Sequence, residues 1–332
     1  MSLGDCRVLV TGADGFIGSH LAEELTRRGV KVRALVMYNS FGRSGWLDSS
    51  PPELAGSMEI LAGDIRDPHA MVELTAGIDV VFHLASLVAI PFSYLSPDNY
   101  VKTNVIGTLN MLQAARTNGV KKFVHTSTSE IYGSAGHVPM DESHPQNAHS
   151  PYAATKIAAD QLALSYLRSF SLPVTVVRPF NTYGPRQSAR AIIPTIISQI
   201  ASGAASIRLG NLDPTRDFTY VSDVVVGFIA AAERPDLEGE VIHLGSGSEI
   251  SIGELVSRIA ALMKSEVEIV SDARRMRPQS SEVDRLVCDN SKAARLLEWS
   301  PKVEFEKGLR RTIQWVQDNL DHPGYRPDRY VI

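Results

Sequence analysis

The first 180 residues alternate between short apolar, β-branched runs and longer amphipathic segments. Each apolar run is nearly continuous, which is typical of strands buried on both faces of a parallel sheet. The segment 19–29 carries Leu21 and Leu25 on one helical face and stops at Gly29. The pattern predicts strands at 7–12, 31–36, 58–65, 79–85, 121–128 and 172–179, and further helices at 104–119 and 151–170.

Strands that alternate with helices predict an α/β fold. The expected architecture is a doubly wound parallel sheet of the Rossmann type, with helices on both faces and right-handed crossovers. After Pro179 the alternation gives way to shorter, proline-interrupted elements. We therefore predict two domains, a Rossmann domain over 1–180 and a smaller C-terminal α/β lobe over 181–332.

Composition narrows the class of protein. The chain has 332 residues, of which 44% are hydrophobic and 21% charged, and a formal net charge of −4. This balance gives no electrostatic basis for binding nucleic acid or an anionic membrane. The longest apolar stretch, 224–232, is shorter than the ~20 residues of a membrane span. The two cysteines, Cys6 and Cys288, lack metal-ligand spacing, so we expect no metal site and a reducing cytoplasmic location.

Three glycines follow the first predicted strand, in the sequence GADGFIG at 12–18. Gly12 would permit a tight turn, Gly15 would let the backbone approach a pyrophosphate, and Gly18 would let the next helix pack closely on the strand. The N-terminus of that helix offers unpaired N–H groups to phosphates. A merely structural turn is the alternative, but strand, glycines and helix occur in the order that dinucleotide binding requires.

The choice of dinucleotide is less clear from the residues. NAD-binding folds usually place an acid after the second strand, to accept a hydrogen bond from the ribose 2′-hydroxyl. Here that strand ends in LVMYNS, so Asn39 or a hydroxyl would have to serve. Arg43 is the nearest arginine for a 2′-phosphate, and NAD is favoured over NADP. Asp64, after the third strand, could accept from the adenine amino group or be a solvated turn acid.

Tyr152 and Lys156 lie four residues apart, so they project from one face of the predicted helix that begins at Pro151. A free tyrosine, with a pKa near ~10, is a poor base at neutral pH. A neighbouring lysine and a nicotinamide cation in a desolvated cleft would stabilise the phenolate. Position after the fifth strand of a dinucleotide fold favours a catalytic pair over a chance spacing.

The fifth strand runs into HTSTSEIYG at 125–133. Thr128 and Ser129 are candidates to orient a substrate oxygen opposite Tyr152. Glu130 is more specific, because hydride transfer at an alcohol needs no carboxylate, whereas proton abstraction next to a carbonyl does. A glutamate that caps the following turn is the alternative. His83 and His125 lie in apolar strands and are interpreted as core residues.

Seven ordered motifs together resemble the extended short-chain dehydrogenase/reductases that modify nucleotide sugars. They are GxxGxxG at 12–18, DVVFHLA at 79–85, NVxGT at 104–108, TSTSEIYG at 126–133, YxxxK at 152–156, RPFNTYGPR at 178–186 and RDFTYVSD at 216–223. The resemblance implies NAD(P) in the first lobe and an NDP-sugar between the lobes. Three substrate-facing stretches, 38–48, 181–197 and 274–293, look most like bacterial NDP-N-acetylglucosamine 4,6-dehydratases of the legionaminic-acid type.

That resemblance implies a particular reaction. Tyr152 would deprotonate the C4 hydroxyl while C4 gives a hydride to NAD, Glu130 would remove the C5 proton, and Ser129 or protonated Glu130 would assist loss of water from C6. Return of the hydride to C6 gives a 4-keto-6-deoxy sugar. A C4-epimerase, which needs no working Glu130, and a UDP-glucuronate decarboxylase remain alternatives. A non-catalytic nucleotide sensor is disfavoured by the intact catalytic residues.

The resemblance also implies a set of ligand contacts and a homodimer. The dimer would pair helices 99–118 and 152–170 with their copies, although the apolar positions fit packing on the sheet equally well. Arg216 and Arg277 would clamp the diphosphate, because a guanidinium binds phosphate in a bidentate way. The other predicted substrate contacts are Asn181 and Arg186, and the predicted cofactor contacts are Gly12, Gly15, Phe16, Ile17, Gly18, Asn39, Asp64, Ile65, Leu84, Ala85, Ser86, Asn104, Tyr152, Lys156 and Pro179.

Overall fold

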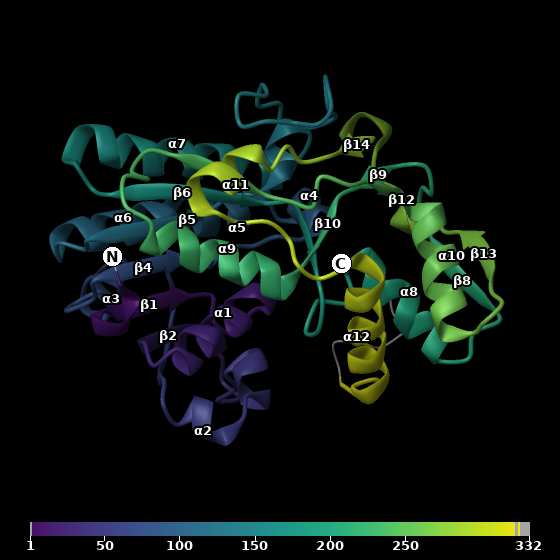
Figure 1. Ribbon diagram of the computed structural model, residues 1–332, viewed down its shortest axis with the longest axis horizontal. Coiled ribbons are helices and arrows are strands. Elements are labelled where there is room, and N and C mark those ends of the chain that lie inside the picture. The colour runs from purple at the N-terminus through teal and green to yellow at the C-terminus, as the bar shows by residue number, and fades with distance from the viewer. Residues whose placement is uncertain (1, 323–324, 326–332) are drawn as a thin grey trace.

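A central parallel sheet organises the chain, of which the computed structural model describes residues 2–322 and residue 325. Seven strands lie in the order β11-β6-β5-β4-β1-β2-β3, and every pair is parallel (Figure 1). The predicted doubly wound Rossmann sheet is confirmed. Its strands are β1 (Arg7–Thr11), β2 (Lys31–Met37), β3 (Glu59–Gly63), β4 (Val80–His83), β5 (Lys122–Thr126), β6 (Val174–Pro179) and β11 (Val241–Leu244).

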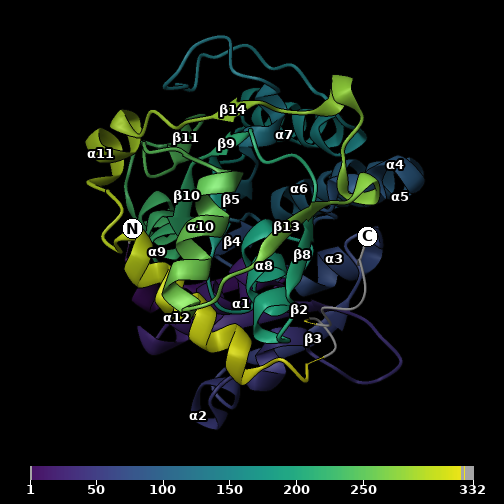
Figure 2. The same cartoon turned by 90° about the vertical axis from the view of Figure 1, so that its right-hand side faces the viewer.

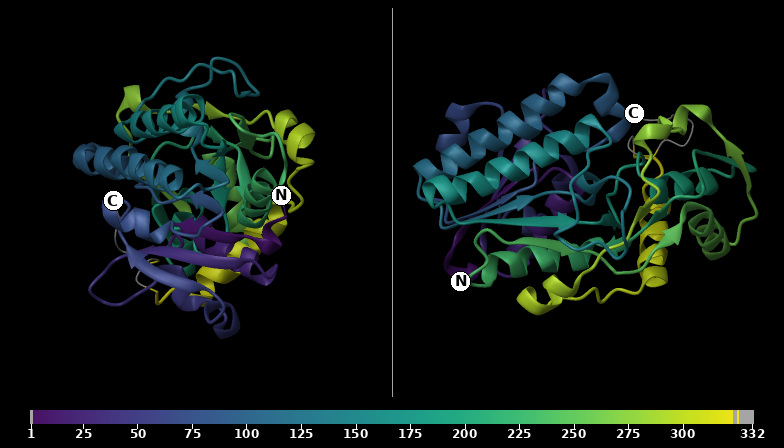
Figure 3. Two further views of the ribbon diagram at one scale, coloured as in Figure 1. Left: turned by 90° about the vertical axis from the view of Figure 1, so that its left-hand side faces the viewer. Right: turned by 90° about the horizontal axis from the view of Figure 1, so that it is seen from above.

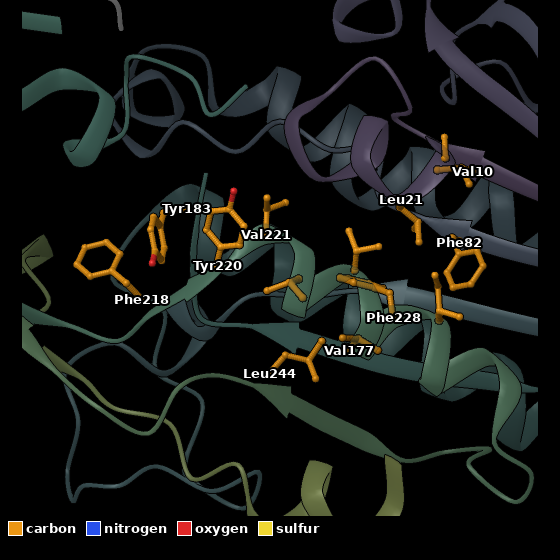
Figure 4. Packing of buried hydrophobic residues seen from close by; sticks show 14 of the residues in the cluster. Val10, Leu21, Phe82, Val177, Tyr183, Phe218, Tyr220, Val221, Phe228 and Leu244 are labelled. Carbon is orange, nitrogen blue, oxygen red and sulfur yellow. The ribbon is translucent and has the colours of Figure 1, made fainter. Parts of the chain in front are cut away.

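Helices cover both faces of the sheet (Figure 3, right). The helices α1 (Phe16–Arg27) and α9 (Val221–Glu233) pack on one face, and α3 (Pro68–Leu74), α6 (Gly107–Thr117) and α7 (Pro151–Phe170) pack on the other. Alternate residues of one strand enter different cores: Val8 and Val10 pack with α1 and α9, whereas Leu9 packs with α6 and α7. Figure 4 shows Val10, Leu21 and Phe228 meeting on the first of these faces.

The chain returns to the sheet after residue 180. Both α9 and β11 come from the C-terminal half, and β11 pairs with β6 through Val241↔Val176 to Leu244↔Pro179. The chain therefore crosses between the lobes more than once, where the sequence analysis placed a single boundary. The apolar run of β11 has only four residues, which is too short for its pattern alone to show that it joins the central sheet.

The smaller lobe is built from short strands and three longer helices (Figure 2). Helix α8 packs against α10 and α12, and the strands form one three-stranded and two two-stranded sheets. The elements from the C-terminal half that lie outside the main sheet and its helices are β7 (Asn181–Tyr183), α8 (Ile192–Ala201), β8 (Ser206–Leu209), β9 (Thr215–Arg216), β10 (Phe218–Tyr220), β12 (Ile250–Ser251), α10 (Ile252–Met263), β13 (Glu268–Ser271), β14 (Arg285–Leu286) and α12 (Phe305–Asp318). Helix α11 (Ser291–Leu297) packs instead against β11 and α9.

The helix predicted from residue 104 begins earlier. Two short helices, α4 (Ile90–Leu95) and α5 (Pro97–Tyr100), lead into a π-helical turn, η3 (Val101–Ile106), that continues directly into α6. A π-helical turn inside a helix is common at functional sites. The remaining short elements are η1 (Leu3–Asp5), η2 (Gly45–Ser49), α2 (Pro52–Ala55), η4 (Ser129–Tyr132), η5 (Ala273–Arg275) and η6 (Gln279–Ser281).

The described residues contain neither a candidate membrane span nor a candidate metal cluster. None of their helices combines the length and apolar character needed to cross a membrane. Within residues 2–322 and 325, no three or more His, Cys, Asp or Glu side chains gather as a metal site would require.

A buried carboxylate fixes α7 to the sheet. One oxygen of Asp160 accepts hydrogen bonds from Ser127 Oγ at 2.7 Å and from Arg178 Nη2 at 2.9 Å, and the other lies 3.2 Å from His125 Nε2. Burial alone would raise the pKa of Asp160, but His125, Arg178 and Ser127 together lower it to about 2. The carboxylate thus joins α7 to β5 and β6 where both strands end.

The same arginine extends this network. Arg178 Nη1 donates to Tyr132 Oη at 2.6 Å, and that hydroxyl lies 2.6 Å from His243 Nε2 on β11. Tyr132 therefore joins the turn η4 to both β6 and β11 through hydrogen bonds.

We expect Asp160→Asn to lower the free energy of unfolding by about 3–5 kcal/mol, because it leaves the Arg178 guanidinium buried without a counter-charge. The pKa of Asp160 is depressed to about 2 in the folded state. Its contribution is therefore present above the unfolded pKa of ~3.9 and is lost as pH falls. Urea unfolding measured between pH 7 and pH 3 tests both points.

The control is Asp98→Asn, which removes an exposed carboxylate that pairs with Lys102. Such a surface pair contributes at most about 1 kcal/mol. Equal unfolding free energies for the two variants would contradict the role given to Asp160.

Candidate active site

The glycine-rich turn lies between β1 and α1 at the carboxyl edge of the sheet, next to β4. Gly12 has φ +69°, and a Cβ there would lie 2.9 Å from the Cα of Ala85. A Cβ on Gly18 would clash with the carbonyl oxygen of Gly12. Helix α1 starts at Phe16 and Ile17 with Gly15 as its N-cap, so its first N–H groups have no acceptor within the helix. The turn is therefore a cradle for an anionic group, at the position where doubly wound sheets bind dinucleotide pyrophosphates.

The loop after β4 forms the neighbouring wall. Leu84 N and Ala85 N both donate to Thr11 Oγ1 at 3.1 Å, so the loop is fastened to the end of β1. Ser86 follows in the same loop, and Leu87 is held from the π-helical turn. The Asn104 amide accepts from Leu87 N at 2.8 Å and donates to Leu87 O at 3.0 Å.

Asn104 thus positions this loop. Its amide nitrogen also donates to Thr155 Oγ1 on α7 at 3.1 Å, so the side chain links the loop to the helix that carries Tyr152. The sequence analysis treated Asn104 as a direct cofactor contact and did not foresee this bracing role.

Two polar side chains predicted near the adenosine have partners within the protein. The Asn39 oxygen accepts from Phe41 N and Arg43 N, both at 3.2 Å, and its nitrogen donates to Arg43 O at 2.7 Å. Asp64 forms a forked pair with Arg66, which lowers the pKa of Asp64. Of the other predicted contacts, Ile65 is buried against Gly107, and Pro179 is the buried last residue of β6.

The predicted tyrosine–lysine pair lies at the start of α7. Ser150 caps the helix by accepting from Ala153 N at 3.1 Å, and Pro151 occupies its first position. Both side chains are buried, Tyr152 at 5% exposure and Lys156 at 4%. Lys156 Nζ donates to Thr126 O at the end of β5, at 2.6 Å.

Burial governs the protonation of this pair. It raises the pKa of Tyr152, an effect opposed by a side-chain hydrogen bond with Thr128. It lowers the pKa of Lys156 to about 8, against the attraction of Asp160. The phenol is therefore a weaker acid than a free tyrosine, and the lysine loses its proton more easily than a free lysine does.

Glu130 lies in the short turn η4 directly after β5. Thr128 caps that turn by accepting from Glu130 N at 3.2 Å, and Ser129 is buried at its start. Capping is thus done by Thr128, which leaves the Glu130 carboxylate for another role. That carboxylate faces Arg277, with Oε2 3.6 Å from Nη1.

Two arginines from the smaller lobe face the first lobe here. Arg216 Nη2 lies 3.6 Å from Glu282 Oε1, and Arg277 Nη1 lies 4.0 Å from the same oxygen. Burial lowers the pKa of Arg216, and the nearby Arg277 cation acts in the same direction. The buried Arg277 Nη1 and the buried Asn181 Nδ2 have no hydrogen-bond acceptor among the described residues. Buried donors of this kind fit an anionic, hydrogen-bonding ligand between the lobes.

The fourth predicted substrate residue lies elsewhere. Arg186 Nη2 pairs with Glu23 Oε1 on α1 at 2.7 Å, and its guanidinium lies over the Trp315 ring at 5.8 Å from the centroid. The structure therefore brings Arg216 and Arg277 together with Glu130 but places Arg186 in a buried ion pair between α1 and α12.

Three contributors to the site were not singled out from the sequence. Glu282 faces both arginines, and Tyr94 Oη lies 2.6 Å from Ser281 Oγ, which in turn donates to His149 O at 2.5 Å. These bonds hold the 277–283 segment against the start of α7. The polar run RRMRPQSSEVD at 274–284 could have indicated Ser281 and Glu282, but only Arg277 was predicted from it.

The chain is similar in sequence to known nucleotide-sugar enzymes. A family model described as GDP-mannose 4,6 dehydratase matches residues 9–312. A dTDP-glucose 4,6-dehydratase from Streptomyces antibioticus is 35% identical over 318 residues, covering 94% of this chain and 92% of the relative. A UDP-N-acetyl-alpha-D-glucosaminuronate decarboxylase from Bacillus cytotoxicus is 37% identical over 323 residues, 94% of this chain and 98% of the relative.

The solved structures agree with the fold. The crystal structure of UDP-glucuronic acid 4-epimerase from Bacillus cereus, in complex with UDP-glucuronic acid and NAD, superposes with a TM-score of 0.86 at 29% identity. The match covers 94% of this chain and 99% of that one. The Rossmann sheet, the buried tyrosine–lysine helix and these matches lead to one conclusion: the chain belongs to the GDP-mannose 4,6 dehydratase family, within the extended short-chain dehydrogenase/reductases.

Proposed function

We propose that this protein is an NDP-sugar 4,6-dehydratase that converts an NDP-N-acetylglucosamine to the 4-keto-6-deoxy sugar nucleotide. At the coarser level it is an enzyme that modifies nucleotide sugars. The observation that supports the finer assignment is the carboxylate of Glu130, which η4 holds after β5 and which Arg277 faces across the lobes.

NAD is the cofactor. The glycine cradle and the free N-terminus of α1 fit its pyrophosphate, and the epimerase structure of the same fold contains NAD. When bound, NAD⁺ would supply a hydride acceptor for C4 of the sugar and, once reduced, a hydride donor for C6, so that the reaction would have no net redox change. Gly12, Gly15 and Gly18 would hold its diphosphate, and the loop 84–86 would line its nicotinamide side.

Tyr152 would accept the proton of the C4 hydroxyl. Because burial raises the pKa of Tyr152, the phenolate needs positive charge nearby. Lys156 is one helical turn away and supplies such a charge when protonated. Thr128, which shares a hydrogen bond with Tyr152, would orient the same substrate oxygen.

Glu130 would remove the proton from C5, which the 4-ketone makes acidic. Arg277 Nη1 lies 3.6 Å from this carboxylate and would hold it in place beside the sugar. Once protonated, Glu130 can donate to the hydroxyl that leaves C6, with Ser129 as the second candidate donor. Elimination across C5 and C6 thus uses one residue for both proton transfers.

The smaller lobe would bind the diphosphate. Arg216 is buried, Arg277 is partly buried with its Nη1 atom unpaired, and the buried amide nitrogen of Asn181 is unpaired as well. A diphosphate would satisfy these donors with charge-assisted hydrogen bonds. Arg186, which pairs with Glu23, is left out of this assignment.

A decarboxylase is the second candidate. The relative from Bacillus cytotoxicus acts on a sugar that carries a carboxylate, and Arg277 beside Glu130 could bind such a group. A C4-epimerase would use Tyr152 in the same way but would leave Glu130 without a task.

Mass spectrometry of products from UDP-, GDP- and dTDP-sugars separates these reactions. We expect an N-acetylglucosamine nucleotide to lose one water. Loss of carbon dioxide from a uronate substrate would instead establish the decarboxylase, and a product of unchanged mass would establish the epimerase.

We expect Glu130→Gln to lower kcat about 10²- to 10⁴-fold, the usual contribution of a general base. Oxidation at C4 does not need Glu130, so reduced cofactor should accumulate on the enzyme and be visible by its near-ultraviolet absorbance. The matched control is Glu282→Gln, which removes a carboxylate from the same cluster and should leave elimination measurable. Wild-type turnover in Glu130→Gln would eliminate the dehydratase assignment.

Tyr152→Phe should lower kcat by a similar factor while sugar-nucleotide binding, measured by calorimetry, stays within a few-fold. Unchanged turnover in Tyr152→Phe would revive the nucleotide-sensor alternative.

The kcat of the wild type, measured as a function of pH, should fall above about pH 8. The pKa of Lys156 is lowered to about 8, so its cation is lost as pH rises.

A further inference from the structure

The end of β2 lacks the acid that NAD-binding sheets place there. Its last residue is Met37, followed by Tyr38 and Asn39. Asn39 cannot take over, because its oxygen already accepts two backbone N–H groups and its nitrogen donates to two carbonyls. The ribose would therefore meet no carboxylate from this strand.

A carboxylate reaches the same place from the glycine-rich turn. Asp14 lies between Gly12 and Gly15, and its Oδ2 accepts a hydrogen bond from Met37 N at 3.3 Å. The side chain crosses from the turn that faces the pyrophosphate to the end of β2. In NAD-binding folds the acid of β2 occupies this junction and accepts from the ribose 2′-hydroxyl.

The loop after β2 holds Asp14 in place. Trp46 N donates to Asp14 O at 3.1 Å, and a Cβ on Gly45, which has φ +61°, would lie 2.7 Å from the Cβ of Asp14. The turn η2 thus packs directly on this residue, and Gly45 leaves the space that such packing requires.

Neighbouring acids already have counter-ions. Asp48 pairs with Arg43 at 3.3 Å, and Asp64 pairs with Arg66. Asp14 forms no ion pair with any cation in the described part of the chain, and burial raises its pKa. The half-buried Asp14 carboxylate accepts backbone N–H groups, from Met37 and from Asp14 itself, and its two oxygens have capacity for a further donor.

We propose that Asp14 accepts a hydrogen bond from the adenosine ribose 2′-hydroxyl of NAD and thereby makes this enzyme select NAD over NADP. A 2′-phosphate would meet this carboxylate as a like charge in a poorly solvated corner. The role belongs to the cofactor and does not depend on which sugar is processed or on which bond is broken.

The test is competition against radiolabelled NAD⁺, with NADP⁺ and the NAD⁺ analogue that lacks the adenosine 2′-hydroxyl as competitors. The wild type should bind the 2′-deoxy analogue and NADP⁺ about tenfold or more weakly than NAD⁺. Asp14→Asn keeps an oxygen for Met37 N but removes the charge. It should bind NAD⁺ and the 2′-deoxy analogue within about threefold of each other and should gain relative affinity for NADP⁺.

Ratios of competitor affinities within one variant do not depend on the folded fraction, so a partly destabilised variant still gives an answer. Asp14→Ala provides a second substitution, and Glu53→Gln controls for the loss of one negative charge on the exposed neighbouring helix α2. The dinucleotide released from the purified variants by acid gives an independent readout of NAD to NADP occupancy. If Asp14→Asn discriminates against the 2′-deoxy analogue as strongly as the wild type does, the proposal is wrong.

Discussion

The buried contact between Asp160 and Arg178 is the interaction on which the active-site geometry depends. It joins α7 to β6, and through Ser127 it also fixes the end of β5. Tyr152 lies on the same helix, two turns before Asp160, so its hydroxyl is positioned by a bond made deep in the protein. An unpaired charge at this depth would be costly, which ties the helix to one register on the sheet.

The catalytic chemistry requires a second constraint, which is the approach of the smaller lobe. The first lobe supplies the proposed base, Glu130, and the smaller lobe supplies Arg216 and Arg277. Neither set forms a site by itself. Arg277 Nη1 lies 3.6 Å from Glu130 and 4.0 Å from Glu282, longer than hydrogen bonds, so this donor remains open to a ligand. A diphosphate between the lobes would therefore complete an arrangement that the protein leaves unsatisfied.

On the cofactor side, too, side chains from distant segments hold the site in place. Thr11 fastens the loop after β4 to the end of β1, and Asn104 links that loop to α7, the helix that carries Tyr152. Strand β2 ends without an acid, and the carboxylate of Asp14 lies at the same place, where we propose that it binds the ribose. A function can stay at one place in a fold while the residue that performs it comes from another segment, because the ligand responds to charge and distance and not to sequence order.

Features that depend on local spacing could be predicted from the order of residues alone. The glycine turn, the strand-and-helix alternation and the pair Tyr152 and Lys156 are set by neighbours within a few residues, and helical or extended geometry then fixes their relative positions. Tertiary structure alone decided the partners of polar side chains. Whether Arg186 faces a substrate or pairs with Glu23, and whether β11 joins the sheet, depends on contacts between segments far apart in the chain. No local pattern encodes such contacts, because burial and pairing energies belong to the assembled fold.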